Sequence, residues 1–250
     1  MSVSAIILAA GKGTRMKSDL PKVLHEVCGR PMVEYVLDAC RDAGATRVVM
    51  VVGHKADLVK ATVNDDRGDL EYVLQEPQLG TGHAVMVAKE QLATMDGPVL
   101  VLAGDGPLLQ ARTLRELIET HRRKGASCTL ATSILPDPGS YGRIVRDENG
   151  ELQSIVEAKE ATPEILDIDE VNVSLYCFDA ADLLNAIDRI DNDNAKGEYY
   201  LTDVLDVLRE DGKTLSAVAA VPPEDTVSIN TVEELATVNE IMKTRRETAT

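Results

Sequence analysis

An apolar run that ends in glycines and cations constrains this chain more than any other feature. The N-terminal segment reads VSAIILAAGKGTRMKSDLPK, and its residues 3–8 are rich in branched aliphatic side chains, which predicts a buried β-strand. Gly11 and Gly13 allow a tight turn in which main-chain N–H groups can face an anion. Arg15 and Lys22 place positive charge close behind that turn. The segment therefore predicts a site for a polyphosphate.

Two well-known phosphate motifs do not fit this segment. A P-loop needs Lys followed by Ser or Thr after its second glycine, and here Thr14-Arg15 follows Gly13. The dinucleotide fingerprint needs a third glycine for close helix–strand packing, and Met16 stands there, which argues against a nicotinamide-dependent enzyme. The remaining alternative is an ordinary β–α turn without function, and the flanking cations and the Pro21-Lys22 step argue against it.

Composition limits the partners of the chain. Its 250 residues suffice for one large α/β domain or two small ones. Hydrophobic residues make up 44% and aromatic residues 3%, so the core must be aliphatic. The formal net charge of −16 argues against nucleic acid or an anionic membrane as the main partner. The N-terminal cations must therefore act locally, and a divalent metal would help them hold an anionic substrate.

Cysteine usage and the N-terminus indicate a cytoplasmic protein. The four cysteines, Cys28, Cys40, Cys128 and Cys177, show no CxxC spacing, so we expect free thiols in a reducing compartment. The N-terminus has no signal-type segment, and no apolar run approaches transmembrane length. We therefore expect a cytoplasmic chain without a membrane partner.

Apolar periodicity predicts strands that alternate with helices. Residues 141–156 read as a hairpin around Glu148-Asn149-Gly150, and the polar tail at 244–250 is expected to fray. Such alternation is typical of an α/β protein with a mixed, mostly parallel central sheet and helices on both faces. Strands are predicted at 3–8, 47–52, 70–74, 99–103, 127–135, 171–178 and 215–221, and helices at 32–42, 55–63, 83–92, 113–124, 180–187, 200–210 and 231–243.

A long motif resembles the signature of the sugar-1-phosphate nucleotidyltransferases. It spans residues 8–35 and reads LAAGKGTRMKSDLPKVLHEVCGRPMVEY, and its PKVLH and GRPM segments are most similar to bacterial N-acetylglucosamine-1-phosphate uridyltransferases. The hexapeptide repeats of the acetyltransferase domain in bifunctional members do not occur in this sequence, so the resemblance covers the uridyltransferase part alone. It implies a Rossmann-like nucleotide-diphospho-sugar transferase fold over 1–250, with a nucleotide-binding half at 1–110, a sugar-binding half at 111–230 and a C-terminal helix and tail at 231–250.

The resemblance implies transfer of a uridylyl group from UTP to N-acetylglucosamine-1-phosphate, with release of pyrophosphate, on the route to peptidoglycan precursors. Mg²⁺ is the implied cofactor, and the partners are these small molecules. We expect a monomer or weak homo-oligomer, because the family trimerises largely through the acetyltransferase domain. Two alternatives stay open: a nucleotidyltransferase for another sugar or base, such as glucose-1-phosphate with dTTP, and a non-catalytic sugar-nucleotide-binding domain.

The segment QEPQLGTG follows the third predicted strand and predicts a base-binding loop. Gln75 offers a donor and an acceptor together, which matches the edge of a pyrimidine, whereas a solvent loop with turn glycines is the alternative. By the resemblance, Gln75 pairs with uracil. The resemblance assigns nucleotide binding to Leu8, Ala10, Gly11, Gly13, Gln75, Gly80, Thr81 and Gly104.

The segment LAGDGPL predicts a metal ligand at the end of a strand. Asp105 follows an apolar strand, where a carboxylate can hold Mg²⁺ beside phosphates, although a lone Asp in a turn is usually a turn former. Asn230 is the second candidate, and helix capping by Asn230 or Thr231 is its alternative. The resemblance favours Asp105 and Asn230 as the metal pair. Ala103 and Gly106 depart from the family pattern, which puts the wall of the nucleotide pocket in question.

Polar residues in the second half form a candidate sugar-binding set. Each of them taken singly is better explained as a surface or capping residue. The resemblance assigns sugar binding to Gly142, Glu157, Asn172 and Thr202. The family commonly has Asn-Thr-Gly where this chain has Asn172-Val173-Ser174, so a bulkier backbone could change which hexosamine fits.

In the implied reaction the sugar phosphate is the nucleophile, so no general base is required and catalysis depends on positioning and charge. Arg15 is expected at the leaving pyrophosphate, and Lys22 between the α-phosphate and the incoming sugar phosphate. The four histidines, His25, His54, His83 and His121, have no metal-ligand spacing, and we interpret His25 and His83 as structural.

Overall fold

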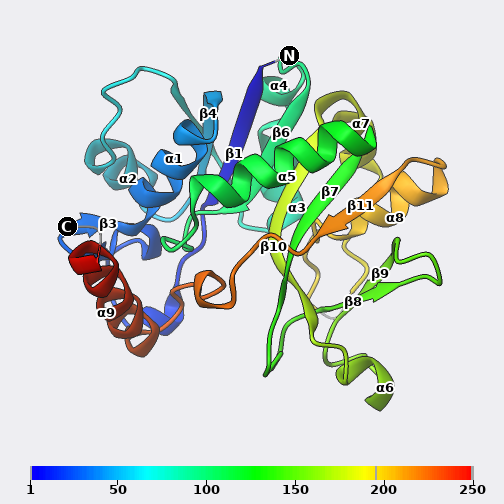
Figure 1. The fold of residues 1–250 in the computed structure, drawn as a ribbon. Helices are drawn as coiled ribbons and strands as arrows, with labels where there is room; N and C mark the ends of the chain where they lie inside the picture. The colour runs from blue at the N-terminus through cyan, green and yellow to red at the C-terminus, as the bar shows by residue number, and fades with distance from the viewer. Residues whose placement is uncertain (1, 195, 249–250) are drawn as a thin grey trace.

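One mixed sheet runs through the computed structural model, which describes residues 2–194 and 196–248 (Figure 1). Its strand order is β11-β7-β10-β6-β1-β4-β5, and β10 alone on this path runs antiparallel to its neighbours among the described residues. The strands are β1 (Val3–Ala9), β2 (Glu26–Val27), β3 (Arg30–Pro31), β4 (Ala45–Val52), β5 (Leu70–Leu74), β6 (Pro98–Ala103), β7 (Cys128–Ile134), β8 (Arg143–Arg146), β9 (Leu152–Val156), β10 (Glu170–Asp179) and β11 (Leu215–Val218).

Helices cover both faces of the sheet, as the sequence predicts. Figure 1 shows α1 and α5 in front of the strands, and they share one aliphatic core with β1 and β4. A second core lies on the opposite face, between the sheet and α3, α4, α7 and α8. It contains Phe178, the one phenylalanine of the chain. The helices are α1 (Met32–Asp42), α2 (Ala56–Thr62), α3 (Thr81–Val87), α4 (Lys89–Leu92), α5 (Ala111–Lys124), α6 (Pro163–Leu166), α7 (Ala180–Ala186), α8 (Asp203–Glu210) and α9 (Val232–Thr248).

Strand β1 is buried on both faces, which explains why its sequence is continuously apolar. Ile7 contributes to the core under α1 and α5, while Ile6 contributes to the core on the opposite face. Side chains alternate across a strand, so a central strand between two helical layers needs apolar residues at every position. The predicted buried strand is therefore confirmed.

Some predicted boundaries were wrong. The helix predicted at 83–92 is divided into α3 and α4, and the helix predicted at 200–210 starts only at Asp203. The tail expected to fray from residue 244 is helical as far as Thr248, and residues 249–250 lie outside the described part. The small hairpin of β2 and β3 has no strong sequence signal, because each of its strands contains only two residues.

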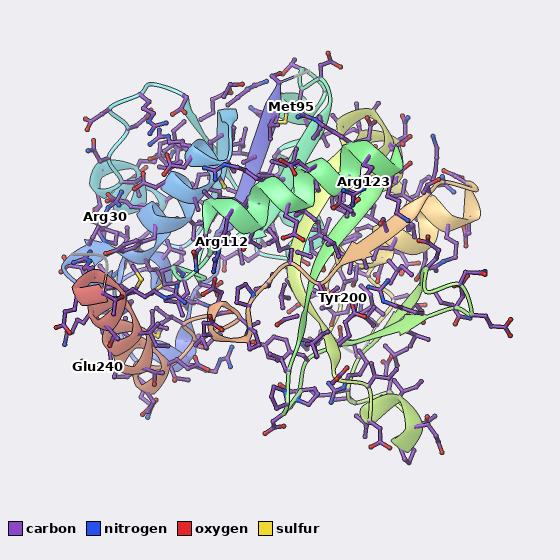
Figure 2. All side chains as sticks on the ribbon, in the orientation of Figure 1. Arg30, Met95, Arg112, Arg123, Tyr200 and Glu240 are labelled. Carbon is purple, nitrogen blue, oxygen red and sulfur yellow. The ribbon has the colours of Figure 1, made fainter. Side chains whose placement is uncertain are left out.

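Helix α9 lies over the segment that follows β1. Its Val238 is buried in a small third core with Met16, Val27 and Ile229. Figure 2 shows Glu240 projecting from the outer side of the same helix. The C-terminal helix thus connects the end of the chain to its glycine-rich beginning.

A buried carboxylate fastens α9 to the body of the fold. The side chain of Asp225 is fully buried, accepts a 2.8 Å hydrogen bond from Gln110 Nε2 and forms an ion pair with Arg245 of α9. Arg245 also donates to the carbonyl oxygen of Leu108 at 3.3 Å. These contacts hold the segment between β11 and α9 in place.

The described helices include none that is both long enough and apolar enough to cross a lipid bilayer. The cysteines Cys28, Cys40, Cys128 and Cys177 are free, as predicted from their spacing.

We expect Asp225→Ala to lower the free energy of unfolding by about 2–3 kcal/mol, because it leaves a guanidinium and an amide without their buried acceptor. Chemical denaturation measures this loss. Glu240→Ala removes an exposed carboxylate that pairs with Lys243 on the same helix, and should change stability by less than about 0.5 kcal/mol. Equal losses in the two variants would contradict the anchoring role of Asp225.

Candidate active site

Neighbouring parallel strands end at one edge of the sheet, and the predicted nucleotide-binding residues follow them. Ala9 pairs with Val52, Val52 pairs with Leu74, and Leu8 pairs with Ala103. The carboxyl edge of a parallel sheet is where α/β proteins bind ligands. Directly beyond these strand ends lie the predicted residues Ala10, Gln75 and Gly104.

The centre of this edge is a cluster of charged and amide side chains. Lys22 Nζ forms an ion pair with Asp105 and donates to Asn230 Oδ1 at 2.7 Å. Arg15 donates to the same Asn230 oxygen at 2.9 Å. The Lys22 and Asp105 side chains are only 14% and 16% exposed, so their charges are screened less than surface charges. The structure therefore brings together both predicted catalytic residues and both predicted metal ligands.

Asn230 is free for this cluster because its neighbour caps the helix. Thr231 Oγ1 accepts from Glu234 N at 3.2 Å, and Glu234 Oε2 accepts from Thr231 N at 2.9 Å. This is a capping box, in which Ser or Thr and a Glu three residues later satisfy each other's main-chain donors. Glu234 also accepts from Asn230 N at 2.6 Å. The amide side chain of Asn230 is thereby released from capping and faces Arg15 and Lys22.

The loop that carries Arg15 is shaped by Gly13 and Met16. Gly13 has φ 63°, and a Cβ on it would lie 2.6 Å from Lys22 Cβ, so only glycine leaves room for the lysine stem. Met16 is 2% exposed and packs under α9. Gly11 faces open space, because no atom lies within 4 Å of the position that a Cβ would take there. Met16 thus anchors one side of the loop in the core, while the turn at Gly11 is open to a ligand.

The predicted base-binding residue is also held in place. Gln75 Nε2 donates to the carbonyl oxygen of Gly80 at 2.9 Å and lies 3.1 Å from His83 Nδ1. The carbonyl can only accept, so it fixes the orientation of the amide group and points the Gln75 carbonyl oxygen elsewhere. His83, interpreted from the sequence as structural, contacts Gln75 directly.

Close backbone approach joins this loop to the segment before α8. Gly80 has φ 103°, and a Cβ there would lie 2.5 Å from the carbonyl oxygen of Tyr199. Thr81 Oγ1 accepts from Leu201 N at 3.0 Å, so this predicted nucleotide ligand ties two loops together. Thr202, predicted to bind sugar, directly follows Leu201 in the chain. It therefore lies near the predicted nucleotide-binding loop, which Leu201 contacts.

The other predicted sugar residues lie together on the far side. Asn172 N donates to the carbonyl oxygen of Gly142 at 2.9 Å. A Cβ on Gly142 would lie 3.4 Å from Glu157 Oε1, so the carboxylate passes close to this glycine. Asn172 is buried at the start of β10, whereas Glu157 is exposed just after β9.

A small cavity lies beside Asp105 and the irregular part of β10. Its volume is about 60 Å³, and it is lined by residues that include Ala103, Asp105, Gly106, Ser174, Thr226 and Ser228. Ala103 and Gly106, the two departures from the family pattern, are thus on its wall. Gly104 N donates to the carbonyl oxygen of Leu8 at 2.9 Å, so these two predicted nucleotide-binding residues contact each other.

Tyr141 connects the sugar side to the loop before α9. Its hydroxyl donates to the carbonyl oxygen of Thr226 at 3.1 Å. Burial raises the pKa of Tyr141, the Thr226 side chain opposes the rise, and the charges of Glu234 and Asp105 add to it. The phenol therefore stays neutral near these carboxylates.

The donor set suits a hard divalent cation. A carboxylate oxygen of Asp105 and the amide oxygen of Asn230 both contact one ammonium group, that of Lys22. Oxygen donors of these types are those that Mg²⁺ takes, usually with one or two protein ligands beside phosphate and water. Among the described residues no group of three or more His, Cys, Asp or Glu side chains could hold a metal ion. The donor chemistry of Asp105 and Asn230 is therefore compatible with such an ion.

Two supporting residues, Glu234 and Met16, were not identified from the sequence, and the contact made by a third, His83, was not predicted. Glu234 had a readable signal, because Thr231 and Glu234 have the spacing of a capping box. Met16 was used only to exclude the dinucleotide motif. His83 had no local signal, since its contact with Gln75 depends on how the loop between them folds.

Comparison with known proteins agrees with this architecture. The family model of the MobA-like NTP transferase domain matches residues 5–165. The bifunctional protein GlmU of Clostridium novyi is 46% identical over 98% of this chain, and that of Limosilactobacillus fermentum is 47% identical over 98%. The chain spans about half the length of these relatives, 53% in both cases. The resemblance to bacterial bifunctional enzymes is thereby confirmed.

A solved structure confirms the predicted nucleotide-diphospho-sugar transferase fold. A crystal structure of UDP-glucose pyrophosphorylase complexed with UDP-glucose superposes with a TM-score of 0.77 and covers 98% of this chain and 100% of that one. The two sequences are 16% identical, so this likeness concerns the fold alone. Since the family model matches well over half of its residues, the chain belongs to the family of MobA-like NTP transferase domains.

Proposed function

We propose that this chain transfers a uridylyl group from UTP to N-acetylglucosamine-1-phosphate and releases pyrophosphate. The observation that carries the proposal is the contact of Arg15, Lys22, Asp105 and Asn230 at the carboxyl edge of the sheet. The uridyltransferase-like motif at residues 8–35 and the similarity to proteins named GlmU support the choice of substrates. The substrates are small molecules, and the proposed location is the cytoplasm.

The reaction is an in-line displacement. An oxygen of the sugar phosphate attacks the α-phosphorus of UTP, and the bond from that phosphorus to the bridging oxygen of the β-phosphate breaks. Pyrophosphate leaves with the bonding electron pair. No proton needs to be removed from the nucleophile, so the protein supplies position and charge instead of a general base.

The proposed roles of the site residues separate the leaving-group side of this displacement from the side of the incoming nucleophile. Arg15 stabilises the charge that develops on the leaving pyrophosphate, and Lys22 bridges the α-phosphate and the incoming sugar phosphate. The exposed turn at Gly11 and Gly13 offers main-chain N–H groups to the phosphates. Gln75 accepts a hydrogen bond from the edge of uracil through its carbonyl oxygen, because its amide nitrogen is directed at Gly80 and His83. Gly142, Glu157, Asn172 and Thr202 bind the sugar.

Asp105 and Asn230 are the proposed ligands of Mg²⁺. When bound, the ion supplies positive charge to the reacting phosphates. In the described structure, Lys22 contacts these same two oxygens. The lysine therefore has to move its ammonium toward phosphate when the ligands take up a metal.

We further propose that residues 1–110 bind the nucleotide and residues 111–230 bind the sugar. The contact between Thr81 and Leu201 crosses this division, and so does the contact between Lys22 and Asn230. Both substrates would therefore be held at one junction of the two halves.

Pyrophosphate release with UTP, Mg²⁺ and a panel of sugar-1-phosphates tests the proposed function. We expect the highest kcat/KM with N-acetylglucosamine-1-phosphate and UTP. A preference for glucose-1-phosphate or dTTP would reassign the specificity, and nucleotide-sugar binding without pyrophosphate release would contradict an enzymatic role.

Arg15→Ala and Lys22→Ala should each lower kcat by about 100-fold or more, the scale seen when one preorganised charge contact to a transition state is lost. Steady-state kinetics at saturating substrate measures this effect. Lys60→Ala is the matched control, because it removes an exposed lysine from α2, and we expect its kcat to equal that of the unchanged chain. Near-normal turnover in either site variant would exclude the role assigned to that residue.

Asp105→Ala should abolish turnover that depends on Mg²⁺, because the carboxylate is the charged ligand of the proposed pair. The measurement is the rate as a function of Mg²⁺ concentration, compared with the same titration for Glu240→Ala. A variant with an unchanged Mg²⁺ dependence would show that Asp105 is not a ligand.

A further inference from the structure

The amide of Asn172 is held at both of its polar atoms. Asn172 Oδ1 accepts from the main-chain N of Ser174 at 3.0 Å, and Asn172 Nδ2 donates to the hydroxyl of Tyr176 at 3.0 Å. A main-chain N–H can only donate, so the amide atom that it contacts is Oδ1, and the atom that faces the Tyr176 hydroxyl is Nδ2. Each amide atom keeps one further hydrogen-bonding position, namely one N–H of Nδ2 and one lone pair of Oδ1.

An irregularity in β10 creates this arrangement. The register between β10 and β7 shifts between Asn172 and Leu175, and Ser174 adopts the left-handed conformation with φ 57°. Left-handed backbone is uncommon for residues other than glycine, so the surrounding contacts must hold Ser174 there. Ser174 is exposed and lines the cavity that also contains Asp105. The bulge therefore turns the main-chain N of Ser174 toward the Asn172 amide, and Ser174 itself reaches the cavity lined by Asp105.

Tyr176 supports the amide from inside the core. Its side chain is 3% exposed and belongs to the apolar core with Phe178, Ile144 and Leu201. Burial raises the pKa of Tyr176 to about 12, hydrogen bonds with the Asn172 and Ser174 side chains oppose the rise, and the nearby charge of Glu157 adds to it. A buried hydroxyl is unfavourable unless it is hydrogen-bonded, and phenylalanine would fill the same apolar space without it. Packing alone therefore does not explain a tyrosine here, whereas holding Asn172 does.

We propose that Tyr176 is a positioning residue that sets the sugar specificity of the site by holding the Asn172 amide in one orientation. This inference rests on the proposed function, because it takes the Asn172 surface as the sugar subsite. The fixed amide presents its remaining N–H and lone pair to a polar substituent of the sugar. Without the Tyr176 hydroxyl, the amide nitrogen loses its buried acceptor and the amide can rotate away from the sugar.

Binding of nucleotide sugars to Tyr176→Phe tests the proposal. We expect the Kd for UDP-N-acetylglucosamine to rise by about tenfold, the scale of one lost hydrogen bond in a buried polar pair, while the Kd for UTP stays unchanged. Calorimetric titration measures both values. In turnover assays, the KM for the sugar phosphate should rise far more than kcat falls, and the preference for N-acetylglucosamine-1-phosphate over glucose-1-phosphate should decrease.

The Asn172→Ala background separates positioning from general damage. If Tyr176 acts through Asn172, then Tyr176→Phe should weaken nucleotide-sugar binding less than about twofold further in that background. Tyr72→Phe is the control for loss of a tyrosine hydroxyl, because the Tyr72 hydroxyl is buried and has no hydrogen-bond partner among the described residues. It should change neither Kd, and all variants should keep cooperative thermal unfolding.

The outcomes distinguish this inference from the proposed function. An equal loss of UTP binding in Tyr176→Phe, an unchanged Kd for the nucleotide sugar, or the same loss with and without Asn172 would each overturn the positioning role. Failure of the unchanged chain to bind any nucleotide sugar would overturn it too. If the unchanged chain binds the nucleotide sugar but releases no pyrophosphate, the enzymatic function fails, and the binding comparison still decides the role of Tyr176.

Discussion

The contact of one lysine ammonium with two oxygens, those of Asp105 and Asn230, determines how the rest of the site is arranged. It joins three segments that are far apart in the sequence, and Arg15 adds a second cation to the same cluster. The whole chain carries a formal charge of −16, which would repel a nucleotide at long range. At this edge two cations face one carboxylate in a partly buried setting, where Coulomb interactions are stronger than in water. The local charge is therefore suited to phosphate although the overall charge is not.

The cluster of Lys22, Asp105 and Asn230 depends on neighbouring residues that do not belong to it. Gly13 leaves room for the stem of Lys22, and Met16 anchors the adjacent loop beneath α9. Glu234 shares the capping of α9 with Thr231 and thereby leaves the Asn230 side chain free. The C-terminal helix is consequently part of the site, because it holds a loop from the beginning of the chain and the ligand candidate Asn230 just before its own first turn.

Periodicity was sufficient to predict the α/β class and the order of most elements, because both faces of the sheet are buried. It did not reveal that β10 inserts antiparallel between β6 and β7, since strand pairing is a long-range property. Asp105 was identified from its place after an apolar strand, whereas capping and metal binding remained open for Asn230. Thr231 and Glu234 provide the capping, with a spacing that was present in the sequence, so the Asn230 side chain is not needed for it. Metal binding by Asn230 stays a prediction. The contact of His83 with Gln75 could not be predicted, because it requires the conformation of the intervening loop.

The antiparallel direction of β10 explains how Asn172, a proposed sugar-binding residue, reaches the same edge of the sheet as the cations of the proposed phosphate site. Parallel strands place their carboxyl ends at the ligand-binding edge, so residues that follow β1, β4, β5 and β6 form the nucleotide side. An antiparallel strand reaches the same edge with its amino end, and Asn172 lies in that part of β10. The hydroxyl and amide groups of Asn172, Ser174 and Tyr176 can hold each other because they share a single irregular strand. The sheet therefore brings two cations and a neutral polar network to one edge, which suits the two chemically different ends of the proposed nucleotide-sugar product.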